Sequence, residues 1–218
     1  MSNGDEHGGT GPLDAGAFGP WLRRTVAMLG RFPGAGDGSD VPCDGCTACC
    51  ESSQFVLVEP DEHDARAAIP AELLFPAPGA PTGFSLLPYD EHGRCPMLVE
   101  GRCSIYAHRP RTCRTYDCRV FAAADVVDDD PTKAAVADRA RRWRFDEPLP
   151  DDAVRHGAVR AAAAFLAEHA GELPERVAPR TATQRAVLAV EIAGLFEGLS
   201  KVGVDDVAAA MGRATRTR

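Results

Sequence analysis

The eight cysteines are the residues of this sequence with the clearest capacity for chemistry, and they form two groups. In the first group, two-residue gaps separate Cys43, Cys46 and Cys49, and Cys50 follows directly. The second group is more widely spaced and comprises Cys95, Cys103, Cys113 and Cys118. A two-residue gap lets a tight turn direct two thiolates at one metal centre. We therefore expect the eight cysteines to be metal ligands.

The spacing of the cysteines bears on which metal they would hold. Three cysteines at two-residue gaps supply three ligands of a [4Fe–4S] cluster in bacterial ferredoxins, where a distant Cys-Pro supplies the fourth. Pro96 follows Cys95 here. Zinc needs only paired cysteine turns. The sequence thus predicts an iron–sulfur cluster or Zn²⁺, with iron slightly favoured.

The sequence leaves the grouping of the ligands open. Eight thiolates could form two four-ligand centres, or one centre with spare thiols. Neighbouring side chains tend to diverge, so Cys49 is expected to join Cys43 and Cys46. Cys50 would face a second centre or none.

Metal-free roles for the cysteines fit the sequence less well. As small buried hydrophobic residues they would be poorly placed, because a tight run of four is a poor core element. Disulfides need an oxidising compartment, but the N-terminus lacks a signal peptide, so we expect a cytoplasmic protein with reduced thiols. No apolar stretch reaches the 18 residues of a membrane span. The nearby His63, His92 and His108 are expected to be solvated.

Charge distinguishes the second cysteine group from the rest of the chain. Six arginines against Glu100 and Asp117 give residues 94–119 a local charge of +4, which four metal-bound thiolates would cancel. The six are Arg94, Arg102, Arg109, Arg111, Arg114 and Arg119. Because the whole chain carries a net charge of -8, we expect this segment to serve metal ions, and we expect no nucleic-acid partner.

The elements that must position these cysteines can be predicted from the pattern of apolar residues. We expect an amphipathic helix at 18–30, strands at 55–58 and 84–87, and a hairpin over 97–106 with its turn at Glu100-Gly101. A short helix should carry Cys113, and helices are expected near 131–144, 152–170, 182–199 and 204–213.

These elements predict an α+β fold. A small metal-stapled cysteine module with short β-hairpins would be followed by a helical C-terminal region. The expected divisions are a disordered tail at 1–17, a cysteine-cluster domain at 18–125, and a helical region at 126–218 that packs on it.

The cysteine motifs resemble a known family. The patterns CxxCxxCC, CPxL and CxIYxxRPxxCRxYxC occur in order over residues 43–118. They resemble the YkgJ-like CxxCxxCC cysteine-cluster family, described as a zinc- or iron-chelating domain. The resemblance implies metal binding and does not imply a reaction. One branch of the family looks like a lysine methylase for flagellin.

The function predicted from sequence is that of a metal-binding cysteine-cluster protein, in which the centre is structural or transfers electrons. One alternative is a cluster-dependent oxidoreductase or protein-modifying enzyme with a substrate groove beside the arginine-rich segment. Another is a zinc-stapled module that binds a protein partner of unknown identity.

Overall fold

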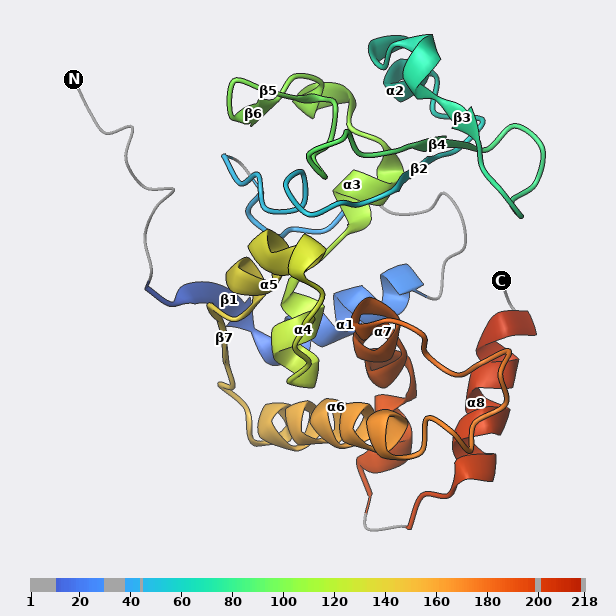
Figure 1. The fold of residues 1–218 in the computed structure, drawn as a ribbon. Helices are drawn as coiled ribbons and strands as arrows, with labels where there is room; N and C mark the ends of the chain where they lie inside the picture. Colours follow the sequence, from blue (N-terminus) through green and yellow to red (C-terminus); the bar gives the residue numbers. More distant parts are fainter. Residues whose placement is uncertain (1–10, 30–37, 44, 199–200, 217–218) are drawn as a thin grey trace. The chain divides into compact units, whose positions relative to one another are not determined.

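The computed structural model describes residues 11–29, 38–43, 45–198 and 201–216, and it divides them into two compact units. The first unit contains residues 38–117 and 129–139, and the second contains 12–29, 118–128 and most of the chain after residue 140. Helices dominate and the strands are short, which confirms the predicted α+β fold (Figure 1).

Short strands and single helical turns make up the first unit. A three-stranded antiparallel sheet has the order β2-β4-β3, and β5 pairs with β6 in a separate hairpin (Figure 1). The strands are β2 (Val56–Val58), β3 (Phe75–Pro76), β4 (Ser85–Leu87), β5 (Leu98–Val99) and β6 (Arg102–Cys103). The helices are α2 (His63–Ala68), α3 (Arg111–Thr115) and α5 (Ala134–Ala140), with 3₁₀ turns at Ala71–Leu73, Tyr106–His108 and Pro131–Lys133.

The β5–β6 hairpin forms at the predicted turn. Glu100 and Gly101 both have positive φ values, of 50° and 72°. Two consecutive left-handed residues are what a two-residue turn needs to match the twist of its strands. The register then sets Leu98 opposite Cys103.

The first unit contains a small hydrophobic core. Among the described residues, seven buried side chains form one cluster: Val56, Val58, Ala65, Ile69, Leu87, Met97 and Ile105. Three cysteines, Cys95, Cys103 and Cys113, pack against its edge. So few buried side chains supply little of the free energy that folding requires, and small domains of this kind commonly add cross-links or metal.

Lys133 fastens the turn that follows the first cysteine group. Its Nζ donates to the carbonyl oxygens of Ser52, at 3.0 Å, and Ser53. The fully buried Ser52 hydroxyl donates to the Ala48 carbonyl and accepts the Val136 N–H, at 2.7 and 3.0 Å. Segment 129–139 therefore holds the end of the cysteine run in place.

The second unit is mainly helical. Its helices α6 and α7 pack on each other, and both contact α1 and α4 (Figure 1). The helices are α1 (Phe18–Leu29), α4 (Arg119–Ala124), α6 (Pro150–Glu168), α7 (Ala182–Ile192) and α8 (Val204–Arg216), with a 3₁₀ turn at Ala193–Phe196. Two strands, β1 (Leu13–Ala17) and β7 (Trp143–Asp146), pair in parallel.

The start of α6 depends on a buried carboxylate. Asp152 Oδ2 accepts the Leu149 N–H at 3.2 Å, which satisfies one of the amides that a helix N-terminus leaves open. A Cβ at Gly19 of α1 would lie 2.2 Å from Asp152 Oδ1. Glycine at position 19 therefore lets the two helices approach closely.

Two sequence expectations differ from the structure in this unit. The expected tail covers residues 1–17, of which 1–10 lie outside the described residues, but Leu13–Ala17 form β1. The expected helix near 131–144 ends at Ala140, and Trp143 begins β7. Both differences have one cause: each strand is too short to be recognised alone, and it forms because the other supplies hydrogen-bond partners.

The remaining predicted helices are confirmed, although the one expected at 182–199 ends at Ile192 and is followed by a 3₁₀ turn. None of the helices in the described part of the chain combines the length and the apolar character needed to cross a membrane.

The Lys133 contacts predict a loss of stability in Lys133→Met. The variant keeps the aliphatic stem but loses two hydrogen bonds from a charged donor, so unfolding in urea should require about 1–3 kcal/mol less free energy. Lys201→Met is the control, because Lys201 is the other lysine of the chain and is exposed in the second unit. Equal stability of the Lys133 variant and the control would contradict this role.

His156 predicts a pH-dependent stability of the second unit. The ring is buried and stacked on Phe18, with 4.2 Å between ring centroids. Burial lowers its pKa, and nearby Arg160 adds to this, although the hydrogen-bonded Glu147 opposes it. The unfolded chain therefore binds a proton first as pH falls below about 6.5, and stability is lost from that pH downward.

The measurement is the unfolding free energy of wild type and His156→Asn between pH 8 and pH 5 at equal metal content. Wild type should lose stability more steeply toward low pH than the variant. His92→Gln, at a ring that is 72% exposed, should retain the wild-type slope. Identical slopes for all three proteins would refute the prediction.

Candidate metal centre

The first cysteine group lies on consecutive tight turns. The Cys46 N–H donates to the Cys43 carbonyl at 3.0 Å, and the Ser52 N–H donates to the Cys49 carbonyl at 3.3 Å. Gly45 adopts a φ of 68°, a left-handed conformation that suits glycine. All four cysteines of the group are half-buried. The local backbone thus has the turn geometry that the spacing predicts.

Cys50 meets Cys95 across a long sequence separation. The Cys95 N–H donates to the Cys50 carbonyl at 2.7 Å, and the two side chains are hydrogen-bonded to each other. The Cys50 pKa is raised, because its thiol donates to the Cys95 sulfur and is buried. The Cys95 pKa is lowered, because its sulfur accepts that bond together with the N–H groups of Met97 and Leu98.

The N–H groups around Cys95 and Cys103 form turns suited to thiolates. Residues two and three positions after Cys95 donate to its sulfur, and Ile105, two positions after Cys103, donates to the sulfur of Cys103. Such N–H donors stabilise a charged sulfur. The β5–β6 hairpin carries both turns, because Cys103 is its last residue and Leu98 its first.

Cys113 completes a set of four with Cys50, Cys95 and Cys103. It lies on α3, which Thr112 ties to β2 through a 2.8 Å hydrogen bond to the Leu57 carbonyl. Burial first, and then the charges of Cys95 and Cys103, raise the Cys113 pKa to about 12. Cys50 likewise responds to Cys95 and Cys103. These four thiols therefore lie near one another, and three of them, Cys95, Cys103 and Cys113, pack against the hydrophobic core.

The remaining cysteines lie in different surroundings. Cys43 interacts with Cys46, and its pKa is raised by burial and by that neighbour. Cys118 is the buried one of the eight and belongs to the second unit, at the start of α4. Its Sγ accepts a hydrogen bond from Trp143 Nε1 at 3.1 Å. No disulfide joins any of the eight, all of which lie among the described residues.

Within the described residues, no three His, Cys, Asp or Glu side chains are already placed to hold a single ion. The thiols of Cys50, Cys95, Cys103 and Cys113 interact electrostatically with one another.

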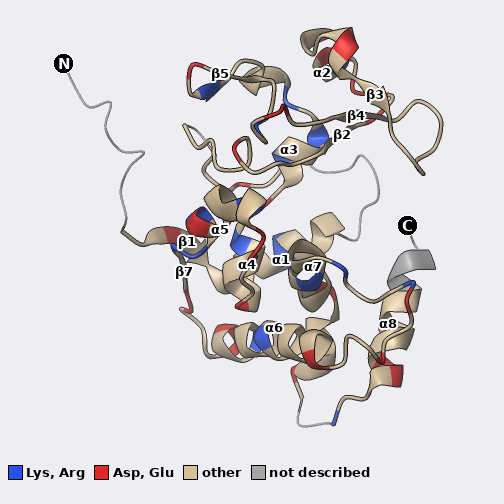
Figure 2. Cartoon of the chain, in the orientation of Figure 1, with Lys and Arg blue, Asp and Glu red and all other residues tan. Residues whose placement is uncertain are grey.

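The arginine-rich segment does not act as one block of charge. Arg111 pairs with Glu59 and Asp61, and Arg114 lies 3.7 Å from Glu62. The three paired acids lie just before α2, and Figure 2 shows basic positions on α3. The expected cancellation of +4 by four thiolates is therefore too simple, since acids neutralise part of that charge.

Glu62 organises the network around Arg111. It is buried, accepts the Glu59 N–H at 2.8 Å through Oε2, and accepts the Arg111 N–H through Oε1. A buried carboxylate is stable only when hydrogen bonds and cations replace its water. Sequence patterns do not reveal this role, because Glu62 stands among other acids at the start of a helix.

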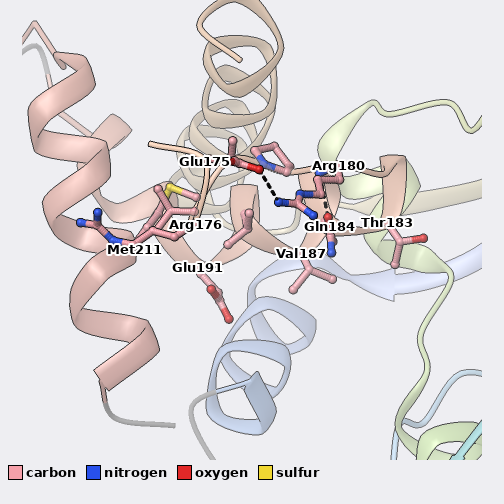
Figure 3. A pocket seen from close by; sticks show the side chains of 12 residues that line it. Glu175, Arg176, Arg180, Thr183, Gln184, Val187, Glu191 and Met211 are labelled. Carbon is pink, nitrogen blue, oxygen red and sulfur yellow. Dashed lines mark hydrogen bonds and ion pairs between the residues drawn. The ribbon is translucent and has the colours of Figure 1, made fainter. Parts of the chain in front are cut away.

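Each unit contains a pocket with both signs of charge. In the first unit, α2 and the 107–114 segment enclose about 270 Å³ lined by arginines, acids, His63 and His108. In the second unit, α7, α8 and the 175–180 segment enclose about 460 Å³ (Figure 3). There Arg180 pairs with Glu175 at 3.1 Å, and its backbone N–H donates to Gln184 at 2.7 Å. Because each pocket is lined by both acidic and basic side chains, its charge does not indicate a particular class of ligand.

The residues present fit a thiolate-bound metal. Soft sulfur donors, backbone N–H groups directed at two of them, and an apolar core beside them are the components such a centre needs. The buried Nε of Arg109 also has no hydrogen-bond partner. A donor of this kind suits a charged sulfur.

Comparison with known proteins agrees with the motifs. No curated protein and no solved structure matches the chain. A family model does match residues 42–133, and its description reads "Putative zinc- or iron-chelating domain". The matched segment starts just before Cys43 and ends at Lys133, whose side chain donates to the Ser52 carbonyl after the first cysteine group. Residues 42–133 are thus matched by the CxxCxxCC zinc- or iron-chelating family that the cysteine motifs indicate.

Proposed function

We propose that this chain is a metal-binding protein whose cysteines form more than one thiolate centre. Cys50, Cys95, Cys103 and Cys113 form one four-thiolate centre, and Cys43, Cys46 and Cys49 belong to another. Cys118 is a further ligand whose partners are not assigned. The observation that carries the proposal is the hydrogen-bonded pair of Cys50 and Cys95, which brings the two cysteine groups together.

The division between adjacent Cys49 and Cys50 has a simple geometric basis. Consecutive side chains leave the backbone in different directions, so neighbours seldom bind one centre. Cys50 interacts with Cys95 and Cys103, and also with its sequence neighbour Cys49, whereas Cys43 interacts with Cys46. This pattern supports separate centres for the two sets.

Iron in an iron–sulfur cluster is the better candidate for the four-thiolate centre. A single zinc ion draws its sulfurs into a compact tetrahedron, while a cluster keeps them apart because iron and sulfide lie between them. The two-residue gaps between Cys43, Cys46 and Cys49, together with Pro96 after Cys95, resemble the spacing of bacterial ferredoxins and support iron. When bound, such a cluster supplies electron transfer or structural cross-linking. No reaction is assigned to the chain.

The identity of the metal is tested on protein purified without oxygen. We expect iron and acid-labile sulfide, with broad visible absorbance that disappears on reduction or exposure to air. Zinc is the matched alternative and would give a colourless protein with no sulfide. A protein that contains neither metal after growth in medium supplemented with both would refute metal binding itself.

The grouping of ligands is tested by single serine substitutions and metal stoichiometry. Cys50→Ser, Cys95→Ser, Cys103→Ser and Cys113→Ser should each deplete the same centre, because a lost thiolate leaves three ligands and an open position. Cys43→Ser and Cys46→Ser should deplete the other centre. If Cys50→Ser and Cys43→Ser remove the same metal, the proposed grouping is wrong even though metal is bound.

A further inference from the structure

The three-stranded sheet of the first unit has one face on the core and one open face. Paired residues of neighbouring strands point to the same side of a sheet, and successive residues of one strand alternate between its sides. The core side holds the buried residues of β2 and β4. The register places Leu57 opposite Leu86, and Leu86 opposite Phe75. These three residues therefore form a row across the other side, where each is at least partly exposed.

Aromatic side chains extend this row. Phe55 directly precedes β2, and the alternation places it on the same side as Leu57. The Phe55 ring contacts the Tyr89 ring, with 5.0 Å between the ring centroids. Phe55, Phe75 and Tyr89 are 56%, 53% and 38% exposed. A single exposed apolar side chain is ordinary, but a contiguous group marks an interaction site. We call the group of Phe55, Leu57, Phe75, Leu86 and Tyr89 the apolar sheet face.

The segment that carries the apolar sheet face is strongly acidic. Residues 51–92 contain eight acidic residues and one basic residue, Arg66, and so carry a net charge of -7 with histidine neutral. Two arginines of α3 offset the acids just before α2. Further acids flank Phe75 and Tyr89 in sequence and are exposed: Glu72, Asp90 and Glu91. Among the described residues, no lysine or arginine forms an ion pair with these three.

This charge limits what can cover the apolar sheet face. A second copy of the chain that used the same face would bring two acidic segments together, and like charges across an interface oppose binding. Anionic lipid surfaces and nucleic acids would be repelled for the same reason. A polypeptide with basic residues beside its apolar ones would instead be attracted. The charge and the apolar surface therefore favour the same kind of partner.

We propose that the apolar sheet face is a docking surface for a protein segment whose apolar or aromatic side chains are flanked by lysine or arginine. The apolar side chains cover the exposed rings, and this burial supplies most of the affinity. The flanking cations lie near acids such as Glu72 and Glu91, which favour this partner over others and speed its association. The inference goes beyond metal binding and does not depend on which metal the cysteines hold.

The test measures binding of a synthetic peptide library to the full chain at a fixed metal content. Each peptide has a varied apolar and aromatic centre, flanked on both sides either by lysines or by glutamates. We expect lysine-flanked peptides to bind, with an affinity that falls as the salt concentration rises, and their glutamate-flanked counterparts not to bind. A library in which no lysine-flanked peptide binds, or in which both kinds bind equally well, would overturn the proposal.

Aromatic substitutions locate the binding surface. The double variant Phe55→Ser, Phe75→Ser should bind the tightest lysine-flanked peptide about tenfold more weakly or worse, the scale of an aromatic contact at the centre of an interface. Val154→Ser is the matched control, because Val154 is 57% exposed and lies in the second unit. Equal affinity of the double variant and the control would overturn the proposal.

The acidic residues are tested separately, because exposed carboxylates contribute little to packing. The double variant Glu72→Gln, Glu91→Gln should bind the same peptide about two- to tenfold more weakly and with a smaller dependence on salt. Glu168→Gln, at an exposed position of α6, is the control. If the aromatic variant melts below wild type, this variant decides the outcome, and an unchanged affinity would count against the proposal.

Other occupants would give different results with the same proteins. Sedimentation of wild type should show no dimer that the double variant Phe55→Ser, Phe75→Ser lacks. Vesicles of phosphatidylserine and phosphatidylcholine should bind neither protein. A dimer or vesicle binding that is present in wild type and lost in the variant would assign the apolar sheet face to a second copy or to a membrane, and would overturn the choice of a basic protein segment.

Discussion

The contact between Cys50 and Cys95 is the constraint on which the first unit depends. Their backbones are joined by a 2.7 Å hydrogen bond and their side chains by another. Through this contact the turns of the first cysteine group meet the segment from Cys95 into the hairpin that ends at Cys103. Few other elements could join these segments, because the strands of this unit are only two or three residues long. Metal bound by thiolates on both sides would convert this weak link into a strong one.

The small hydrophobic core gives that link its importance. Buried side chains from β2, β4 and α2 form the core, and three cysteines lie at its edge. Apolar burial on this scale barely offsets the conformational entropy of ordering a segment with so much irregular chain. Polar contacts add to it, as where Lys133 and Ser52 fix the first cysteine run. Thiolate–metal bonds, if formed as proposed, would be the largest remaining contribution.

Ion pairs and hydrogen bonds compensate the partly buried charges of this unit. Arg111 pairs with Glu59, and the buried Glu62 accepts the Arg111 N–H, which keeps the connection between α2 and α3 in a single arrangement. Arg109 lies outside that network, with its guanidinium over the Tyr106 ring. The second unit has a conventional helical interior, where burial lowers the pKa of His156 and Trp143 donates to Cys118. The family match covers little of that unit, since it ends at Lys133.

The sequence by itself determined the features that depend on neighbours along the chain. The tight turns around Cys43 and Cys46 follow from two-residue spacing, and the hairpin turn follows from Glu100-Gly101. The helices followed from apolar periodicity. The family was recognisable for the same reason, because its motifs are local strings of residues.

Tertiary structure alone decided which distant residues meet. The sequence left open whether Cys50 would face a second centre, and it did not indicate that Cys50 would meet Cys95, that Arg111 would pair with Glu59, or that Lys133 would hold Ser52. Strands β1 and β7 were missed because neither is stable without the other. Such contacts depend on how the whole chain folds. A local sequence pattern does not show which of several chemically similar residues will come within contact distance.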